Sequence, residues 1–178
     1  MEIIQDLIQK GRINRPGTEN SRKYITIHDT ANKKKGADAK AHATYLKTLN
    51  KLTSWHYTVD DECAYQHIPD SEKSYHTSRA YANENSIAIE ICVNQDGDFS
   101  KAKENAVELV RGLMERYEIP VENICAHRDW TGKDCPAALV GESWNDFLDR
   151  CAKKEPEVEE RFITLDELKA MGCSGIRW

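Results

Sequence analysis

The most apolar run of the chain, residues 86–93 (Ser-Ile-Ala-Ile-Glu-Ile-Cys-Val), places the strongest constraint on its fold. A short, nearly continuous apolar run of this kind is typical of a central strand that is covered on both faces of a sheet. Glu90 interrupts the run in its middle. Because a carboxylate is costly to bury alone, Glu90 is expected either to pair with another charge or to face a polar cleft.

The segments around this run alternate between strand and helix patterns. Further strands are predicted at 24–28, 55–59, 64–68 and 123–126, with a hairpin at the acidic turn 60–62. Helices are predicted at 3–8, 38–49, 101–117 and 144–151. Asp38 is the expected cap of the second helix, and its expected inner stripe is His42, Tyr45, Leu46 and Leu49. This order of elements predicts an α/β fold with a central mixed β-sheet flanked by helices.

Chain length and composition predict one main domain followed by a small appendage. The 178 residues are enough for a single hydrophobic core. The charged, proline-containing residues 153–161 indicate a linker between a domain at 1–152 and a short helical tail at 162–178. The tail is too short for a core of its own. Its apolar residues are therefore expected to dock on the main domain or to mediate self-association.

Charge and hydropathy exclude several classes of protein. The net charge of −5 offers no broad basic face for nucleic acid, and no stretch has the apolar length of a membrane span. The first residues lack the basic and apolar regions of a secretory signal, so synthesis in the cytoplasm is expected. Disulfides are not expected in that reducing compartment, and five of the six cysteines are interpreted as small, mostly buried hydrophobes. The exception is Cys135.

Residues 126–136 (Ala-His-Arg-Asp-Trp-Thr-Gly-Lys-Asp-Cys-Pro) contain the strongest chemical signal in the chain. They place His127 and Cys135 eight positions apart across a turn-prone loop, and imidazole and thiolate are both good zinc ligands. His28, at the end of a predicted strand, is the best candidate for a third ligand. Three protein ligands leave the fourth tetrahedral position for water, which favours a catalytic over a structural zinc site.

Other interpretations of these residues stay open. A closed structural zinc site needs a fourth ligand, usually from a close Cys-x-x-Cys pair, and the sequence has no such pair. A Cys/His protease dyad at Cys135 is conceivable, but it leaves Glu90 and one histidine without a role. Taken singly, His67 and His76 could be surface residues, and His56 could be half-buried in its strand.

Several motifs together resemble the zinc-dependent N-acetylmuramoyl-L-alanine amidases that are related to peptidoglycan recognition proteins. They are Ile-Thr-Ile-His-Asp-Thr-Ala-Asn, Ser-Trp-His-Tyr-Thr-Val, Asn-Ser-Ile-Ala-Ile-Glu and Ala-His-Arg-Asp, the last followed by Lys-Asp-Cys-Pro. The resemblance spans residues 14–152 and extends in particular to endolysins of phages and prophages of Gram-positive bacteria. It implies a peptidoglycan-recognition-protein-like fold and one Zn²⁺ per chain held by His28, His127 and Cys135. It also implies hydrolysis of the amide between N-acetylmuramic acid and L-alanine in bacterial peptidoglycan.

Carried over by position, the resemblance implies roles for five further residues. Glu90 matches the general base, and Lys133 matches a cation that stabilises the negative charge developing on the attacked carbonyl. His56 and His76 match positions that line the cleft. Trp55 stands where some relatives have a tyrosine that touches the reacting carbonyl, and its indole offers a single hydrogen-bond donor there.

The resemblance also bears on where the protein acts. An endolysin without a signal peptide would reach the cell wall through a separate membrane pore. One alternative is a cytosolic amidase that recycles soluble muropeptides. Another is a peptidoglycan-binding module without catalysis, which would be expected to lack the cysteine ligand, whereas Cys135 is present.

Overall fold

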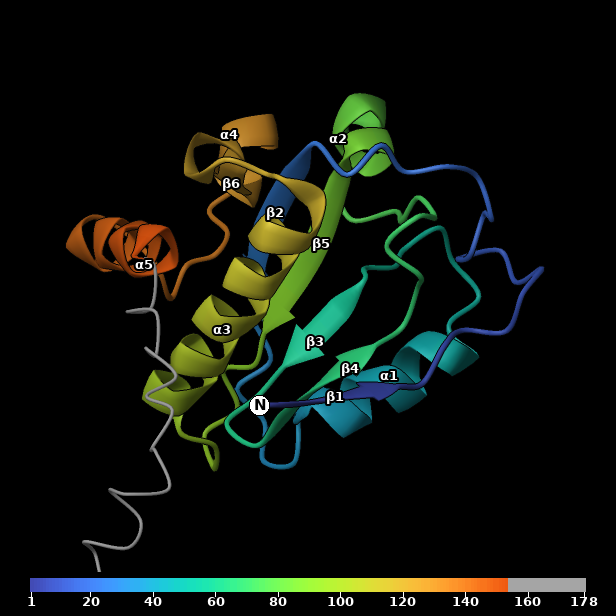
Figure 1. Cartoon of the computed structure of the whole chain (residues 1–178). Coiled ribbons are helices and arrows are strands. Elements are labelled where there is room, and N and C mark those ends of the chain that lie inside the picture. Colours follow the sequence, from blue (N-terminus) through green and yellow to red (C-terminus); the bar gives the residue numbers. More distant parts are fainter. Residues whose placement is uncertain (154–178) are drawn as a thin grey trace, which may run out of the picture.

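A six-stranded sheet forms the centre of the computed structural model, which describes residues 1–153 (Figure 1). The strands lie in the order β1-β4-β3-β5-β2-β6. They are β1 (Glu2–Gln5), β2 (Tyr24–Asp29), β3 (Tyr57–Val59), β4 (Cys63–Gln66), β5 (Ser86–Ile91) and β6 (Ile124–Ala126). The helices are α1 (Ala39–Thr48), α2 (Ala80–Asn85), α3 (Phe99–Tyr117), the 3-10 turn η1 (Val121–Asn123), α4 (His127–Thr131) and α5 (Glu142–Ala152).

The apolar strand β5 lies inside the sheet, parallel to both of its neighbours, β3 and β2. The β1–β4 and β2–β6 pairs are also parallel, whereas the β3–β4 hairpin is antiparallel. The predicted α/β fold with a mixed sheet is therefore confirmed. Because β2, β5 and β6 run in the same direction, residues at their carboxyl ends meet at one edge of the sheet.

Side chains alternate along β5 and divide the core into two parts. Ile87, Ile89 and Ile91 belong to the larger core, which α3 and α5 cover (Figure 1). Ala88 belongs to the smaller core, together with Leu46 of α1. Since successive side chains of a strand point to opposite faces, Glu90 points to the same side as Ala88.

Helix α1 begins at its predicted cap. The Asp38 side chain accepts a hydrogen bond from the Ala41 backbone N–H at 2.7 Å, as expected of an N-cap residue. His42 lies on the buried face, with Nδ1 2.7 Å from the Asp38 carbonyl oxygen. Tyr45 is 50% exposed, so its assignment to the inner stripe is wrong. The small Ala43 fills the buried face together with its larger neighbours.

The predicted helix at 3–8 is also wrong, because the first residues form the edge strand β1. β1 pairs in parallel with β4, and the Ile8 backbone N–H donates to the His67 carbonyl oxygen at 2.9 Å. Apolar residues at 3, 4, 7 and 8 fit a helical period, but so short a window cannot exclude a strand. Ile8 anchors the segment in the smaller core, whereas Ile3 is 44% exposed.

Apart from Lys153, the predicted linker and tail lie outside the described residues. Within residues 1–153, the five cysteines are all free, and no helix has the length and apolarity needed to cross a membrane.

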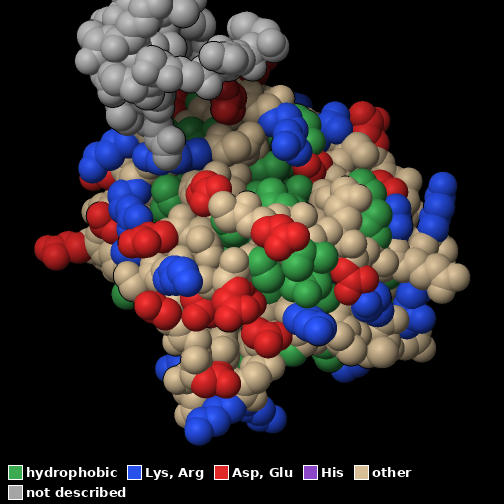
Figure 2. Space-filling view, turned by 60° about the horizontal axis from the view of Figure 1, so that its bottom comes forward, with side chains coloured by type: hydrophobic (Ala, Val, Ile, Leu, Met, Phe, Trp, Pro, Cys, Tyr) green, Lys and Arg blue, Asp and Glu red, His purple; other side chains and the backbone are tan. Residues whose placement is uncertain are grey.

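Figure 2 shows one face of the molecule, where acidic and basic side chains are intermixed around an exposed apolar patch. No histidine side chain is visible on that face.

Candidate metal centre

His28 is the fifth residue of β2 and lies near the carboxyl end of that strand. Its side chain is almost fully buried. The ring has a neighbour at each nitrogen: Nε2 lies 3.0 Å from His76 Nδ1, and Nδ1 lies 3.7 Å from Cys135 Sγ. Strand β2 thus delivers a buried imidazole whose Nδ1 faces a thiol.

His127 is the first residue of α4, directly after β6. The start of this short helix is held by Asp129, whose Oδ2 accepts from the Ala126 backbone N–H at 2.7 Å. The His127 ring is buried, and its centroid lies 4.6 Å from that of the His28 ring. Its Nδ1 is a buried atom with no hydrogen-bond partner among the described residues. Buried polar atoms without a partner are rare and call for an explanation such as an unseen ion.

The loop that carries Cys135 is tied to α4 by Arg128. The Arg128 backbone N–H donates to the Cys135 carbonyl oxygen at 3.0 Å. Its guanidinium Nη2 donates to the carbonyl oxygens of Pro136 and, at 2.9 Å, Leu139. One residue therefore fixes the path of the loop at the cysteine and directly after it.

Asp29 fastens the same loop to β2. Its Oδ2 accepts from the Ala138 backbone N–H at 2.8 Å, and its Oδ1 accepts from the Ala31 N–H at 3.1 Å. Its own backbone N–H faces the Cys135 sulfur, and this contact works to lower the pKa of the thiol. Sequence analysis missed Asp29 and Arg128. The signal that could have found them is that each directly follows a predicted ligand.

His28, His127 and Cys135 form a buried group whose ligand atoms all lie within 4.8 Å of one another. Two imidazoles and a thiol are a donor set that suits zinc. The unpartnered Nδ1 of His127 supports the same interpretation, because a metal ion would satisfy it. The residues present therefore fit a single metal ion.

Burial determines the protonation of this group. It lowers the pKa of His28 well below the ordinary value, and the neighbouring His76 and His127 add to the shift. Burial also lowers the pKa of His127, with the charge of Lys133 adding to it. Both imidazoles are therefore neutral near pH 7, as metal ligands must be. Burial raises the pKa of Cys135 to about 11, so metal binding would release its thiol proton.

Glu90 lies beside this group on the neighbouring strand. It is paired in register with His28 of β2 and with Thr58 of β3. Its Oε2 is buried and has no hydrogen-bond partner in the part of the chain that the structure describes. Burial raises the pKa of Glu90 well above the ordinary value, the charge of Asp29 raises it further, and Lys133 opposes the shift. The geometry thus provides an unbonded carboxylate oxygen with a high affinity for a proton.

Lys133 lies on the wall of a groove of about 650 Å³ that reaches the candidate metal centre. The groove is lined by Leu52, Thr53, Tyr75, His76, Thr77, Ser78, His127, Thr131, Gly132 and Lys133. The Lys133 side chain is exposed, and its backbone N–H donates to Thr131 Oγ1 at 3.2 Å. A cation and a candidate metal ligand, His127, therefore share one open groove.

The remaining predicted residues lie at different depths. His76 lines the groove and contacts His28. His56 is fully buried, with its Nδ1 accepting from a backbone N–H of β5, so its half-buried assignment is wrong. Trp55 is 7% exposed and donates to a hydroxyl of β3. His67 is fully buried and not a surface residue. Substrate contacts by Trp55, His56 and His76 stay predictions.

The fold and this donor set together define a candidate mononuclear metal centre on a mixed α/β sheet. Residues 18–138 match the family described as N-acetylmuramoyl-L-alanine amidase, and the chain belongs to this family. The family resemblance seen in the sequence motifs is therefore confirmed.

Curated relatives from Bacillus subtilis extend this match. The chain is 44% identical to N-acetylmuramoyl-L-alanine amidase CwlH over 161 residues, covering 89% of this chain and 64% of the relative. It is 48% identical to the amidase XlyA over 149 residues, covering 83% of this chain and 50% of the relative. The chain thus spans between half and two thirds of the length of these relatives.

Solved structures agree with the fold. The catalytic domain of XlyA superposes with a TM-score of 0.82 at 46% identity, covering 85% of this chain and 99% of that domain. PlyL superposes with a TM-score of 0.80 at 34% identity, covering 88% of this chain and 100% of that structure. A mutant endolysin from Bacillus subtilis superposes with a TM-score of 0.81 at 47% identity, covering 85% and 99%. The predicted peptidoglycan-recognition-protein-like fold is thereby confirmed.

Proposed function

We propose that this chain is a zinc-dependent amidase that hydrolyses the bond between N-acetylmuramic acid and L-alanine in bacterial peptidoglycan. The observation that carries the proposal is the buried group of His28, His127 and Cys135 beside an open groove. Family membership supports the reaction class, and the names of CwlH and XlyA support the bond that is cleaved.

The three ligands would hold one zinc ion and leave a coordination position free for water. When bound, zinc supplies Lewis-acid activation of that water near neutral pH. The protein contributes a rigid frame for the ligands. Asp29 and Arg128 hold the Cys135 loop against the two elements that carry the histidines. The cysteine is therefore preorganised for metal binding.

Glu90 would act as the general base. Its buried, unbonded Oε2 can accept a proton from the attacking water and pass it to the amine nitrogen of L-alanine as the amide bond breaks. Register pairing with His28 keeps this carboxylate at the same edge of the sheet as the ligands. Burial raises the pKa of Glu90, and the charge of Lys133, joined by that of a bound zinc ion, would oppose this shift and keep Glu90 able to accept the proton.

Lys133 would stabilise the oxyanion that forms on the attacked carbonyl. Lys133 lines the groove, and its charge adds to the effect of burial in lowering the pKa of the candidate ligand His127. A cation placed where negative charge develops is worth more in the transition state than in the bound substrate. The exposed position of Lys133 leaves its side chain free to meet the substrate.

The shape of the groove supports a polymeric substrate. It is open to solvent and mixes an apolar residue, Leu52, with hydroxyls and the aromatic Tyr75. A glycan strand with its stem peptide can lie in such a groove without being enclosed. We therefore place the proposed activity at the intact cell wall, and soluble muropeptides are the competing substrate.

Mass spectrometry of fragments released from purified cell walls tests this proposal. Cleavage at the proposed bond yields stem peptides with a free L-alanine amino terminus and glycan strands with a free lactyl carboxylate. Cleavage within the glycan or between two stem-peptide residues would contradict it. Faster turnover of soluble muropeptides than of intact walls would instead support the recycling alternative.

A further inference from the structure

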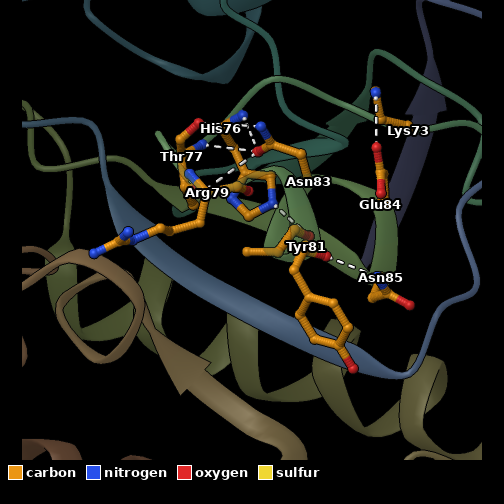
Figure 3. A network of polar contacts seen from close by, with 9 residues as sticks. Lys73, His76, Thr77, Arg79, Tyr81, Asn83, Glu84 and Asn85 are labelled. Carbon is orange, nitrogen blue, oxygen red and sulfur yellow. Dashed lines mark hydrogen bonds and ion pairs between the residues drawn. The ribbon is translucent and has the colours of Figure 1, made fainter.

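His76 contacts the candidate metal centre without belonging to its ligand group. Its Nδ1 lies 3.0 Å from His28 Nε2, and its Nε2 lies 3.3 Å from the Ala82 carbonyl oxygen in α2. Figure 3 shows the His76 ring directed toward the backbone of this helix. The carbonyl and the two histidines form a chain of hydrogen bonds that reaches His28 at Nε2. The other ring nitrogen of His28, Nδ1, lies 3.7 Å from the Cys135 sulfur.

The direction of each hydrogen bond follows from the carbonyl at the far end. A carbonyl oxygen can only accept, so Nε2 of His76 carries a hydrogen. In a neutral ring the other nitrogen is then an acceptor, so Nδ1 of His76 accepts from Nε2–H of His28. Nδ1 of His28 is consequently left without a hydrogen, and its lone pair points toward the Cys135 sulfur. The chain of bonds selects the one tautomer of His28 that can bind a metal through Nδ1.

The segment that carries His76 is itself held in place. Asn83 Oδ1 accepts from the backbone N–H groups of His76 and Thr77 at 3.1 and 3.0 Å, and Asn83 Nδ2 donates to the Thr77 carbonyl oxygen at 3.1 Å (Figure 3). Asn83 is buried, so these bonds are shielded from competing water. The His76 ring is therefore fixed at its backbone as well as at its Nε2.

We propose that His76 is a positioning residue that fixes the tautomer and ring orientation of the metal ligand His28. This inference rests on the zinc centre proposed above. It differs from the substrate contact that sequence resemblance implied, because it acts through His28 and affects metal binding in the absence of substrate. Hydrogen-bond partners of ligating histidines commonly contribute ~10–100-fold to metal affinity.

Zinc affinity of the full chain, measured by competition with a chelator, tests the inference with two substitutions. His76→Leu removes the acceptor and should weaken zinc binding by ~10–100-fold. His76→Asn places an amide oxygen near the former Nδ1 and should retain most of the lost affinity. A matched control is His42→Leu, which removes a buried histidine on α1 and should leave zinc affinity unchanged.

A second measurement uses the wild-type chain, so its result does not depend on whether a variant folds. Nitrogen-15 NMR of the histidine rings in the zinc-loaded wild-type chain should show His28 protonated at Nε2. Protonation of His28 at Nδ1, or equal zinc affinity of wild type and a folded His76→Leu, would overturn the inference while leaving the zinc site intact. Failure of the wild-type chain to bind zinc would instead refute the proposed function itself.

Discussion

His28 and Glu90 are register partners on the adjacent parallel strands β2 and β5, so their side chains emerge side by side on the same face of the sheet. This relationship places a carboxylate with one buried oxygen next to a candidate metal ligand, although 62 positions separate the two residues in the sequence. Glu90 itself is not a member of the ligand group of His28, His127 and Cys135. A substitution at Glu90 can therefore test catalysis without removing a metal ligand.

Replacing Glu90 by Gln should separate metal binding from catalysis. The substitution keeps the shape of the side chain but removes the base, so zinc content should persist while turnover falls by ~10²–10⁴-fold. Zinc analysis, a thermal melt and a wall-lysis rate on one preparation check this. If Glu90→Gln is less stable than wild type but fully active, the residue is structural and the general-base role is wrong.

Replacing Lys133 by Met should affect the turnover number more than substrate binding. The ammonium is needed mainly for charge that develops in the transition state, so kcat should fall while KM changes little. Steady-state kinetics on a soluble muropeptide substrate measure both constants. A raised KM with an unchanged kcat would show that Lys133 only binds the substrate.

Replacing Arg128 by Met should loosen the Cys135 loop. The change keeps an apolar stem but leaves the carbonyl oxygens of Pro136 and Leu139 without their donor, at a cost of about 1–3 kcal/mol in unfolding free energy. Zinc should also dissociate faster from this variant, as a chelator assay can measure. Arg116→Met is the control, since the Arg116 side chain is 62% exposed. Equal zinc release from the two variants would argue against the loop-positioning role.

Stability should fall in mild acid because His67 is buried without charge. Burial lowers the pKa of His67 from 6.5 to about 3. Between these values the unfolded chain binds a proton at His67 that the folded chain does not, so stability falls as the pH drops below 6.5. His67→Gln should therefore lose about 2 kcal/mol less unfolding free energy than wild type between pH 7 and pH 5. Parallel losses measured by urea unfolding at the two pH values would rule out this contribution.

Sequence patterns located the parts of the fold that depend on local chemistry. The apolar run containing Glu90 is the interior strand β5, and Asp38 caps α1, because strand burial and helix capping are set by nearby residues. The ligand candidates could be selected by residue type and by position at strand ends. The parallel arrangement of β2 and β6, which the pattern of elements suggested but did not specify, brings the two histidines together. Cys135 joins them because Arg128 and Asp29 hold its loop against these elements.

Features that depend on distant contacts could not be predicted in this way. The segment containing Ile3 has apolar spacing that suits a helix, but it forms a strand because its backbone pairs with the edge of β4. Tyr45 continues a helical stripe, yet it is 50% exposed, because the buried face of α1 is formed by Ala43 and Leu46 instead. The contact between His76 and His28 joins a loop residue to a strand residue. No sequence pattern links the two, so only the folded chain reveals the contact.

The central claim is that His28, His127 and Cys135 hold a zinc ion on which amide cleavage depends. The most direct test is to measure zinc content and wall-lysis rate together while zinc is removed by a chelator and then restored, for wild type and for Cys135→Ala. The wild-type chain should carry about one zinc, lose its activity with the metal and regain both. Cys135→Ala should retain little zinc and little activity. Full zinc content and full activity in a folded Cys135→Ala, or undiminished lysis by the zinc-free wild type, would contradict the claim.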